Sequence, residues 1–449
     1  MAARDDRLAV ALDLRRWAEA LAYPRGHLGV DRYTRALYGG LCAREAELDL
    51  RPLVFARLDD PSFEDVRAAT DALEAAVGRR VARSWRKRWG ILCVLWALWK
   101  LEEAGSRLPA LAGWSRARRL ALHGRLFRPG PPAARRRWDL YHSTFSPLPP
   151  GDWTAGAVRV LTVHDCDSAR LPELSSDGGA VIREVLASVD PERDFVLCPS
   201  ESTRRDVREL VRLPECQTRV IPLAADPLYA AADGEAALPL LRSLGVRPGG
   251  YVLLLGQYPA RKNVLRAMQA FAESRRAGVG RDHVLLVVVE RRHLKRIASF
   301  RAQSGLDESA ARLALDVDDG TLAGLYADAA AFAYVSLYEG FGMPPLEAMH
   351  AGCPVVVANT TSLPEVVGNA GLYVDPRDVD SIAEGLTRVL TDEPLRRRMV
   401  SAGRKRAAGF SWDRTVAGTV EFYRHALAVS RPESARRVRA GRRRRVEVG

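Results

Sequence analysis

Residues 336–376 read SLYEGFGMPPLEAMHAGCPVVVANTTSLPEVVGNAGLYVDP, and this stretch decides the fold class. A strand pattern at residues 331–335 precedes it, a helical pattern covers residues 344–351, and a second strand pattern covers residues 354–358. Strand, helix and strand in this order are typical of a doubly wound, parallel α/β sheet. We therefore expect a Rossmann-like domain around this stretch.

The loop before the helix has the chemistry of an anion site. Gly340 and Gly342 allow backbone N–H groups to point at an anion, and the helix that follows presents its positive end to the same place. Glu339 and Glu347 lie eight positions apart with a turn between them. Carboxylates beside an anion site are suited to accept hydrogen bonds from sugar hydroxyls. The loop therefore predicts a site for a ligand that carries both phosphate and sugar.

A second motif, LGQYPARKN at residues 255–263, joins a strand end, a glycine turn, two cations and a helix start. Lys262 supplies a point charge and Arg261 a planar fork, with a helix N-terminus behind them. This combination predicts a phosphate site that includes Gly256. Whether Arg261 reaches the phosphates or lies on the surface stays open at this point.

Strand and helix patterns alternate in both halves of the 449-residue chain. They include a turn-rich loop at residues 26–32, strands at 220–223 and 284–289, and a helix at 379–390. The alternation pauses at a polar connection near residue 230 and then restarts. We expect two Rossmann-like domains at residues 1–228 and 235–410, a terminal helix at 411–430 and a basic tail at 431–449. In the first domain, Ser200 is expected to cap the helix that follows it.

Positive charge is concentrated in two segments. The net charge of the chain is +13, but residues 79–138 alone carry +14 and residues 431–449 carry +6, so the remainder is acidic. A nucleic-acid binder more often spreads basic residues over a folded face, and no nucleic-acid partner is expected.

The Trp/Arg-rich insertion at residues 79–138 has two interpretations. Trp85, Trp89, Trp96 and Trp99 fall on one helical stripe next to Arg and Lys residues. Such a stripe suits a peripheral contact with an anionic membrane, and it equally suits a helix packed on its own domain. The tail is either an additional membrane attraction or a solvated segment.

The expected cellular location depends on three sequence patterns: long apolar runs, secretory signals and paired cysteines. The longest uncharged apolar run is eleven residues, at 89–99, and a spanning helix needs about twenty. The first residues show no secretory signal pattern, and the six cysteines form no CxxC pair. We expect a cytoplasmic protein, with the inner face of the membrane as an open alternative, and no disulfide framework or zinc site.

Two glutamates with seven residues between them, flanked by SLYEGFG and by LEAM.AG.PVV, resemble glycosyltransferase family 4, the group 1 glycosyl transferases. The resemblance is specific over residues 250–412. It continues more weakly through GVDRYTRAL at residue 29, HSTFSPLP at 142, LTVHD at 161 and CPSESTRRD at 198. It implies a retaining enzyme of the GT-B fold, with two facing Rossmann-like domains and a deep cleft between them.

The resemblance also implies residue roles. Glu339 would contact hydroxyls of the donor sugar, Glu347 would bind the ribose, and Arg261 and Lys262 would neutralise the donor diphosphate. His164, after a strand of the first half, would line the cleft near the sugar and act with Glu339 and Lys262 in catalysis. The remaining donor-binding positions implied are Gly29, Gly256, Gly340, Phe341, Gly342 and Met343.

No cofactor or metal is expected, since cationic side chains stand where a metal would otherwise neutralise the diphosphate. Asp165-Cys166-Asp167 and Asp316-Val317-Asp318 match an Asp-x-Asp pattern. The first lies in the other half and the second is interpreted as a loop beside the base, so neither is expected to hold a metal.

The function implied is transfer of a hexose from a nucleotide-diphosphate sugar to a glycan or a lipid-linked acceptor, in cell-surface polysaccharide or glycolipid biosynthesis. Two alternatives stay open. One is a non-catalytic, membrane-associated or nucleic-acid-binding protein on a degenerate GT-B fold, suggested by the basic tail and by Gln257, where many relatives have Arg. The other is a GT-B enzyme that uses a sugar phosphate.

Overall fold

The computed structural model describes residues 7–14, 29–53, 138–149, 154, 156–175, 179–256 and 260–430. Most of the Trp/Arg-rich insertion, Gln257 and the basic tail lie outside the described residues. Interpretations that depend on them therefore stay predictions. The contacts divide the described chain into two compact units. One holds the residues up to Thr162 with 187–196 and those from Val420 onward, and the second holds Val163–Leu186 and Leu197–Thr419.

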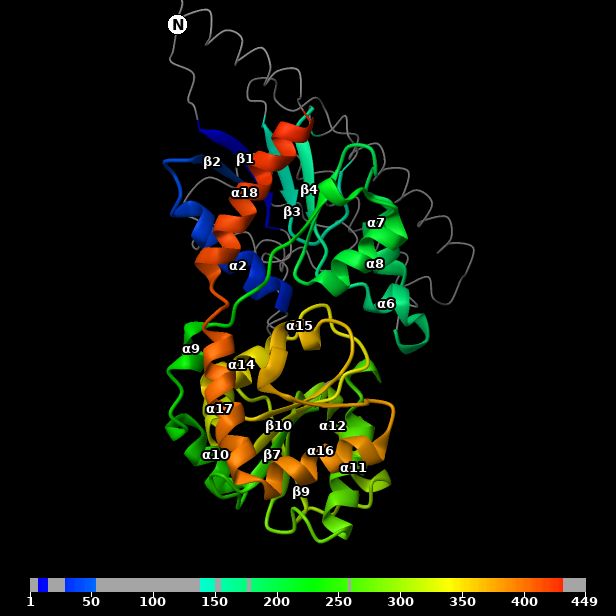
Figure 1. Cartoon of the computed structure of the whole chain (residues 1–449), viewed down its shortest axis with the longest axis vertical. Helices are drawn as coiled ribbons and strands as arrows, with labels where there is room; N and C mark the ends of the chain where they lie inside the picture. Colours follow the sequence, from blue (N-terminus) through cyan, green and yellow to red (C-terminus); the bar gives the residue numbers. More distant parts are fainter. Residues whose placement is uncertain are drawn as a thin grey trace, which may run out of the picture. The chain divides into compact units, whose positions relative to one another are not determined.

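The strands form two six-stranded sheets, coloured blue to green and green to yellow in Figure 1. The first has the order β2-β1-β3-β4-β5-β6 and the second the order β12-β11-β10-β7-β8-β9. The pairs β1–β2, β1–β3 and β3–β4, and every neighbouring pair of the second sheet, are parallel. The strands of the first sheet are β1 Leu8–Asp13, β2 Leu48–Leu53, β3 Leu140–Ser143, β4 Val158–Thr162, β5 Phe195–Cys198 and β6 Thr218–Val220. Those of the second are β7 Tyr251–Leu255, β8 Val284–Val289, β9 Ala311–Leu315, β10 Ala331–Tyr334, β11 Val355–Ala358 and β12 Leu372–Val374.

Helices alternate with these strands along the chain. The helices before β7 are α2 Gly29–Cys42, α6 Asp167–Arg170, α7 Ala180–Ala187, α8 Glu201–Val211, α9 Pro227–Ala230 and α10 Leu238–Ser243. Those after β7 are α11 Val264–Arg276, α12 Leu294–Gln303, α13 Asp319–Asp328, α14 Met343–Ala351, α15 Leu363–Val367, α16 Val379–Thr391, α17 Glu393–Ala407 and α18 Trp412–Ser430. Two parallel sheets with alternating helices confirm the expected α/β class. The cleft and the domain boundaries expected from the sequence stay predictions.

The core of the second unit explains why its sheet is so regular. Strands β7 and β8 are runs of buried Val and Leu, which suits a sheet covered on both faces. Helix α11 buries Val264, Met268 and Phe271 in the same cluster to which α16 contributes Ile382 and Leu386. Burying each such side chain contributes about 1.5–3 kcal/mol. This packing fixes the strand ends from which the site loops leave.

Several element boundaries differ from those expected. The sequence placed Gly29 in a loop, but Gly29 is the first residue of α2. A strand was expected at residues 220–223, whereas β6 ends at Val220, two residues before Pro222. The expected cap is confirmed, because the Ser200 hydroxyl accepts a hydrogen bond from the Thr203 N–H at 3.1 Å.

Candidate functional site

The two motifs of the second half meet at the carboxyl edge of the second sheet. Gly256 directly follows β7, and Arg261 and Lys262 lie in the short 3-10 helix Ala260–Lys262 before α11. The loop with Glu339 connects β10 to α14. Strands β7 and β10 are parallel neighbours, so both loops leave the sheet at the same edge. This is the edge at which ligands of open α/β sheets bind.

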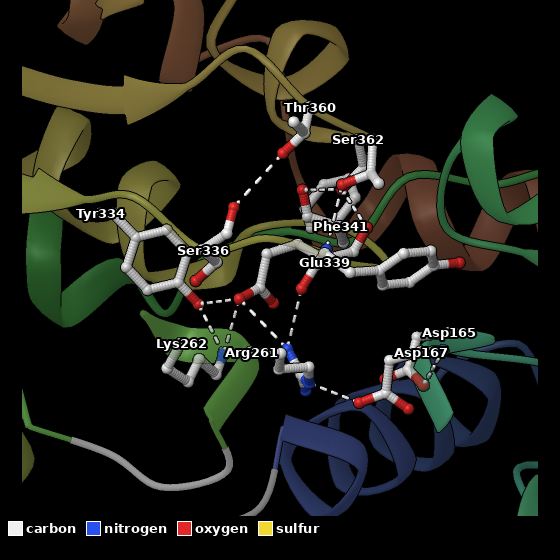
Figure 2. Close-up of polar contacts among 12 residues, drawn as sticks. Asp165, Asp167, Arg261, Lys262, Tyr334, Ser336, Glu339, Phe341, Thr360 and Ser362 are labelled. Atoms are coloured by element: carbon white, nitrogen blue, oxygen red, sulfur yellow. Dashed lines mark hydrogen bonds and ion pairs between the residues drawn. The ribbon is translucent and has the colours of Figure 1, made fainter. Parts of the chain in front are cut away.

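Lys262, Glu339 and Tyr334 form a hydrogen-bonded triangle, shown in Figure 2. The Lys262 ammonium donates to the Glu339 carboxylate at 2.8 Å and to the Tyr334 hydroxyl at 2.7 Å. The Tyr334 hydroxyl donates to the same carboxylate oxygen at 2.8 Å. Glu339 is only 7% exposed. The triangle holds a buried carboxylate and a cation in one fixed arrangement.

Arg261 points into the site and not to the surface. Its guanidinium lies 3.2 Å from the Glu339 carboxylate, donates to the Tyr338 carbonyl at 3.0 Å and pairs with Asp167 (Figure 2). The sequence pattern places Asp167 in the other half of the chain. The structure corrects this, because α6 begins at Asp167 and brings its carboxylate to Arg261. Two cations and two carboxylates therefore make up the charged centre of the site.

Electrostatics keep this centre ionised. Burial opposes ionisation of Glu339, but Lys262 and Arg261 overcome it and lower the pKa of that carboxyl to about 2. Burial lowers the pKa of Lys262, and the Glu339 carboxylate opposes that shift. Burial, followed by the adjacent Asp167 carboxylate, raises the pKa of Asp165 to about 7. Asp165, which precedes Asp167 by two residues, therefore changes charge near neutral pH.

Hydroxyl side chains form hydrogen bonds with the backbone of the loop that carries Glu339. The Ser362 hydroxyl donates to the carbonyls of Glu339 and Phe341, at 2.8 Å each. The Glu339 N–H donates to the Thr361 hydroxyl at 3.0 Å. The Gly340 carbonyl accepts from the hydroxyls of Ser200, at 2.7 Å, and Thr203, at 3.0 Å. Hydrogen bonds within the protein thus hold this loop in a defined conformation.

Glycine is required at Gly340 by close approach. A Cβ there would lie 2.0 Å from the His164 carbonyl oxygen and 2.5 Å from the Asp165 Cβ. Gly342 caps α14 at a φ of 110°, a conformation that a side chain would strain. A Cβ on Gly256 would come within 2.8 Å of Val287. Each motif glycine is therefore explained by local geometry.

The remaining expected site residues are placed as follows. Glu347 is 3% exposed in α14. Burial, followed by the charge of Glu347, raises the pKa of the Tyr326 phenol. Met343 is the first residue of α14, and Phe341 packs edge-to-face on Phe410 with ring centroids 5.9 Å apart. The side chain of His164 is buried, and its backbone lies over Gly340. Gly29 belongs to the first unit, and its expected role in donor binding stays a prediction.

Sequence reasoning missed Tyr334, Asp167 and the hydroxyls of Thr361 and Ser362. Tyr334 ends a buried strand, so the sequence shows it only as part of an apolar pattern.

No group of three or more metal-binding side chains occurs among the described residues. None of the described helices is long and apolar enough to cross a membrane.

Comparisons with known proteins find one family whose sequences match this chain. A family model described as glycosyl transferases group 1 matches residues 247–406, and one described as Glycosyltransferase Family 4 matches residues 29–227. The O-antigen chain mannosyltransferase B of Escherichia coli is 33% identical over 276 residues, which cover 59% of this chain and 70% of that protein. The chain belongs to the group 1 glycosyltransferases.

This group 1 glycosyltransferase is also similar to a second mannosyltransferase and to a solved structure. The serotype-specific mannosyltransferase WbdA of Escherichia coli is 30% identical over 244 residues, but the chain spans only 30% of its length. The crystal structure of Anabaena Alr3699/HepE in complex with UDP-glucose superposes with a TM-score of 0.62 at 15% identity, covering 92% of this chain and all of that one. The second likeness shows the fold, and the expected GT-B architecture is confirmed.

Proposed function

We propose that this glycosyltransferase is a retaining hexosyltransferase that uses a nucleotide-diphosphate sugar and needs no metal. The acceptor would be a glycan or a lipid-linked glycan in cell-surface polysaccharide biosynthesis. The observation that carries the proposal is the buried cluster in which Arg261 and Lys262 both contact Glu339. Two fixed cations beside a carboxylate match a donor that presents a diphosphate next to sugar hydroxyls.

In the proposed reaction, the diphosphate would exchange with the carboxylates that Arg261 and Lys262 hold in this structure. The bond between the anomeric carbon and the diphosphate breaks, and the negative charge that grows on the leaving oxygen is stabilised by the two cations. The acceptor oxygen bonds to the anomeric carbon on the same face, and its proton passes to the departing phosphate. Glu339 would accept hydrogen bonds from the sugar hydroxyls, with His164 on the other side of the sugar.

The relatives support mannose as the first hexose to test. The O-antigen chain mannosyltransferase B and WbdA are both named as mannosyltransferases. Alr3699/HepE has been crystallised with UDP-glucose, which supports a nucleotide-diphosphate donor. A cytoplasmic location and a peripheral membrane contact remain predictions from the sequence.

The test is release of nucleoside diphosphate from a panel of nucleotide sugars, each with and without acceptor glycan and EDTA. We expect Lys262→Ala and Glu339→Gln to reduce turnover at least about a hundredfold, because each removes charge stabilisation at the reacting centre. Lys295→Ala is the matched control, since Lys295 is exposed on α12 of the same unit.

Three outcomes would contradict the proposal. Full activity of Lys262→Ala would remove the diphosphate role, and loss of activity in EDTA would remove metal independence. Binding of nucleotide sugars without turnover, with every acceptor tested, would support the non-catalytic alternative.

A further inference from the structure

A cavity opens at the edge of the second sheet opposite to the charged centre. Its volume is about 710 Å³, and its lining includes Gly249, His283, Ala330 and Pro354. These residues precede β7, β8, β10 and β11, so the cavity lies at the amino ends of strands whose carboxyl ends carry the charged cluster. The cavity is therefore separate from the candidate donor site. Its volume suits a small-molecule ligand.

The lining is strongly basic. One face of α17 contributes Arg396, Arg397 and Arg404 to the cavity, while Glu393 is the single carboxylate among the described lining residues. Arg396 is held in place, because it donates to the carbonyls of Val389 and Leu390 at 2.8 Å each. Arg397 pairs with Glu393 at the rim. The cavity thus carries a net positive charge before any ligand is considered.

Two lining groups have donor capacity that the described chain does not use. The Arg404 guanidinium lies against Gly352, where a Cβ would come within 2.6 Å of its Nη2, and it makes no hydrogen bond or ion pair with described residues. The Nδ1 atom of His283 is buried and has no hydrogen-bond partner among them. Burial, followed by the charges of Arg247 and Arg396, lowers the pKa of His283. Two arginine charges therefore act on this ring, and the charge of Asp282 opposes them.

We propose that this cavity is a second anion-binding site, which takes a phosphate-bearing ligand through Arg404, Arg397 and the ring of His283. Arginine forks match phosphate oxygens, and Ser401 adds a hydroxyl to the same lining. The ligand is a phosphorylated small molecule or the headgroup of an anionic lipid, since both present the same oxygens. Binding of a phosphate-bearing ligand in this cavity does not require the transferase reaction, so the proposed site does not depend on the proposed function.

The first test is titration of the full chain with inorganic pyrophosphate by calorimetry, in the Lys262→Ala background so that the donor site is weakened. We expect binding that Arg404→Gln weakens about tenfold or more, because a charge-assisted hydrogen bond is lost. Arg398→Gln is the matched control, since it removes the same charge from an exposed position of α17 outside the cavity lining. Equal weakening by Arg398→Gln, or none by Arg404→Gln, would overturn the site.

A second readout uses the wild-type chain and does not depend on the folding of the Lys262 variant. Pyrophosphate should raise the midpoint of the His283 imidazole titration followed by NMR, with the signal assigned by its loss in His283→Gln. Flotation with phosphatidylglycerol vesicles separates the two ligand sources, because only a headgroup site gives vesicle binding that depends on Arg404. An unchanged His283 titration together with no Arg404-dependent vesicle binding would refute the proposal.

Discussion

At the scale of single residues, Tyr334 has a role that its strand position conceals. Its hydroxyl accepts from Lys262 and donates to Glu339, and the Lys262 ammonium lies 5.2 Å from the centre of its ring. Tyr334 is thus a positioning residue that holds the Lys262 ammonium and the Glu339 carboxylate in a fixed arrangement. Such buried networks are stabilising only when each member keeps its partner.

Tyr334→Phe should lower kcat about tenfold and leave the KM for donor within about threefold, because the charges remain but their geometry loosens. Steady-state kinetics with the preferred nucleotide sugar measure both constants. Tyr251→Phe is the matched control, since it removes a buried hydroxyl bonded to the Leu325 carbonyl at 2.7 Å, away from the cluster. An unchanged kcat in Tyr334→Phe would mean that the hydroxyl does not position the pair.

The sequence predicted the identities of Glu339, Lys262 and Arg261 because each lies in a loop after a strand, where polar side chains are conspicuous. It left the orientation of Arg261 open, and it set Asp167 aside. Both depend on contacts between segments about a hundred residues apart, such as α6 and the 3-10 helix at Ala260–Lys262. Local patterns carry no information on such contacts.

At the scale of elements, strong periodicity predicted strands and helices well. The run of β8 and the pattern of α16 stand close to their expected positions. Strand β3, with the sequence LYHS, was missed because two of its four residues are polar. The His142 ring is hydrogen-bonded to Thr162 at 2.8 Å and, far along the chain, to the Tyr423 hydroxyl at 2.6 Å.

The amino end of α8 depends on a carboxylate from another helix. Glu365 of α15 accepts hydrogen bonds from the N–H groups of Glu201, at 2.6 Å, and Ser202, at 2.7 Å. Glu365→Ala should lower the free energy of unfolding by about 1 kcal/mol, because two helix-end donors lose their partner. Urea unfolding followed by circular dichroism measures this, with Glu384→Ala on the exposed face of α16 as the control. Equal stability of both variants would show that solvent replaces this cap without cost.

At the scale of the whole molecule, Asp165 ties stability to pH. The folded chain holds a proton on this carboxyl up to about pH 7, while the unfolded chain loses it near 3.8. The folded state therefore binds more protons between these values, so this group makes the free energy of unfolding fall as pH rises through that window. Above about pH 7 its contribution is constant.

Asp165→Asn should remove this contribution, so its Tm should exceed that of the wild type by a margin that grows from about pH 5 to about pH 7 and then levels off. Thermal melts across this range test the prediction. Glu384→Gln serves as the control, because it replaces an exposed carboxylate with the same change of charge. A difference in Tm that stays flat with pH would contradict the raised pKa.

The pairing of Arg261 and Lys262 with Glu339 and Asp167 has a consequence for selectivity. Any incoming anion must compete with carboxylates that belong to the protein. Under the proposed function, free orthophosphate would make fewer contacts in this exchange than a nucleotide sugar, which also presents its base, ribose and hexose. Under the same proposal, the carboxylates of Glu339 and Asp167 would therefore select against small anions that resemble the products.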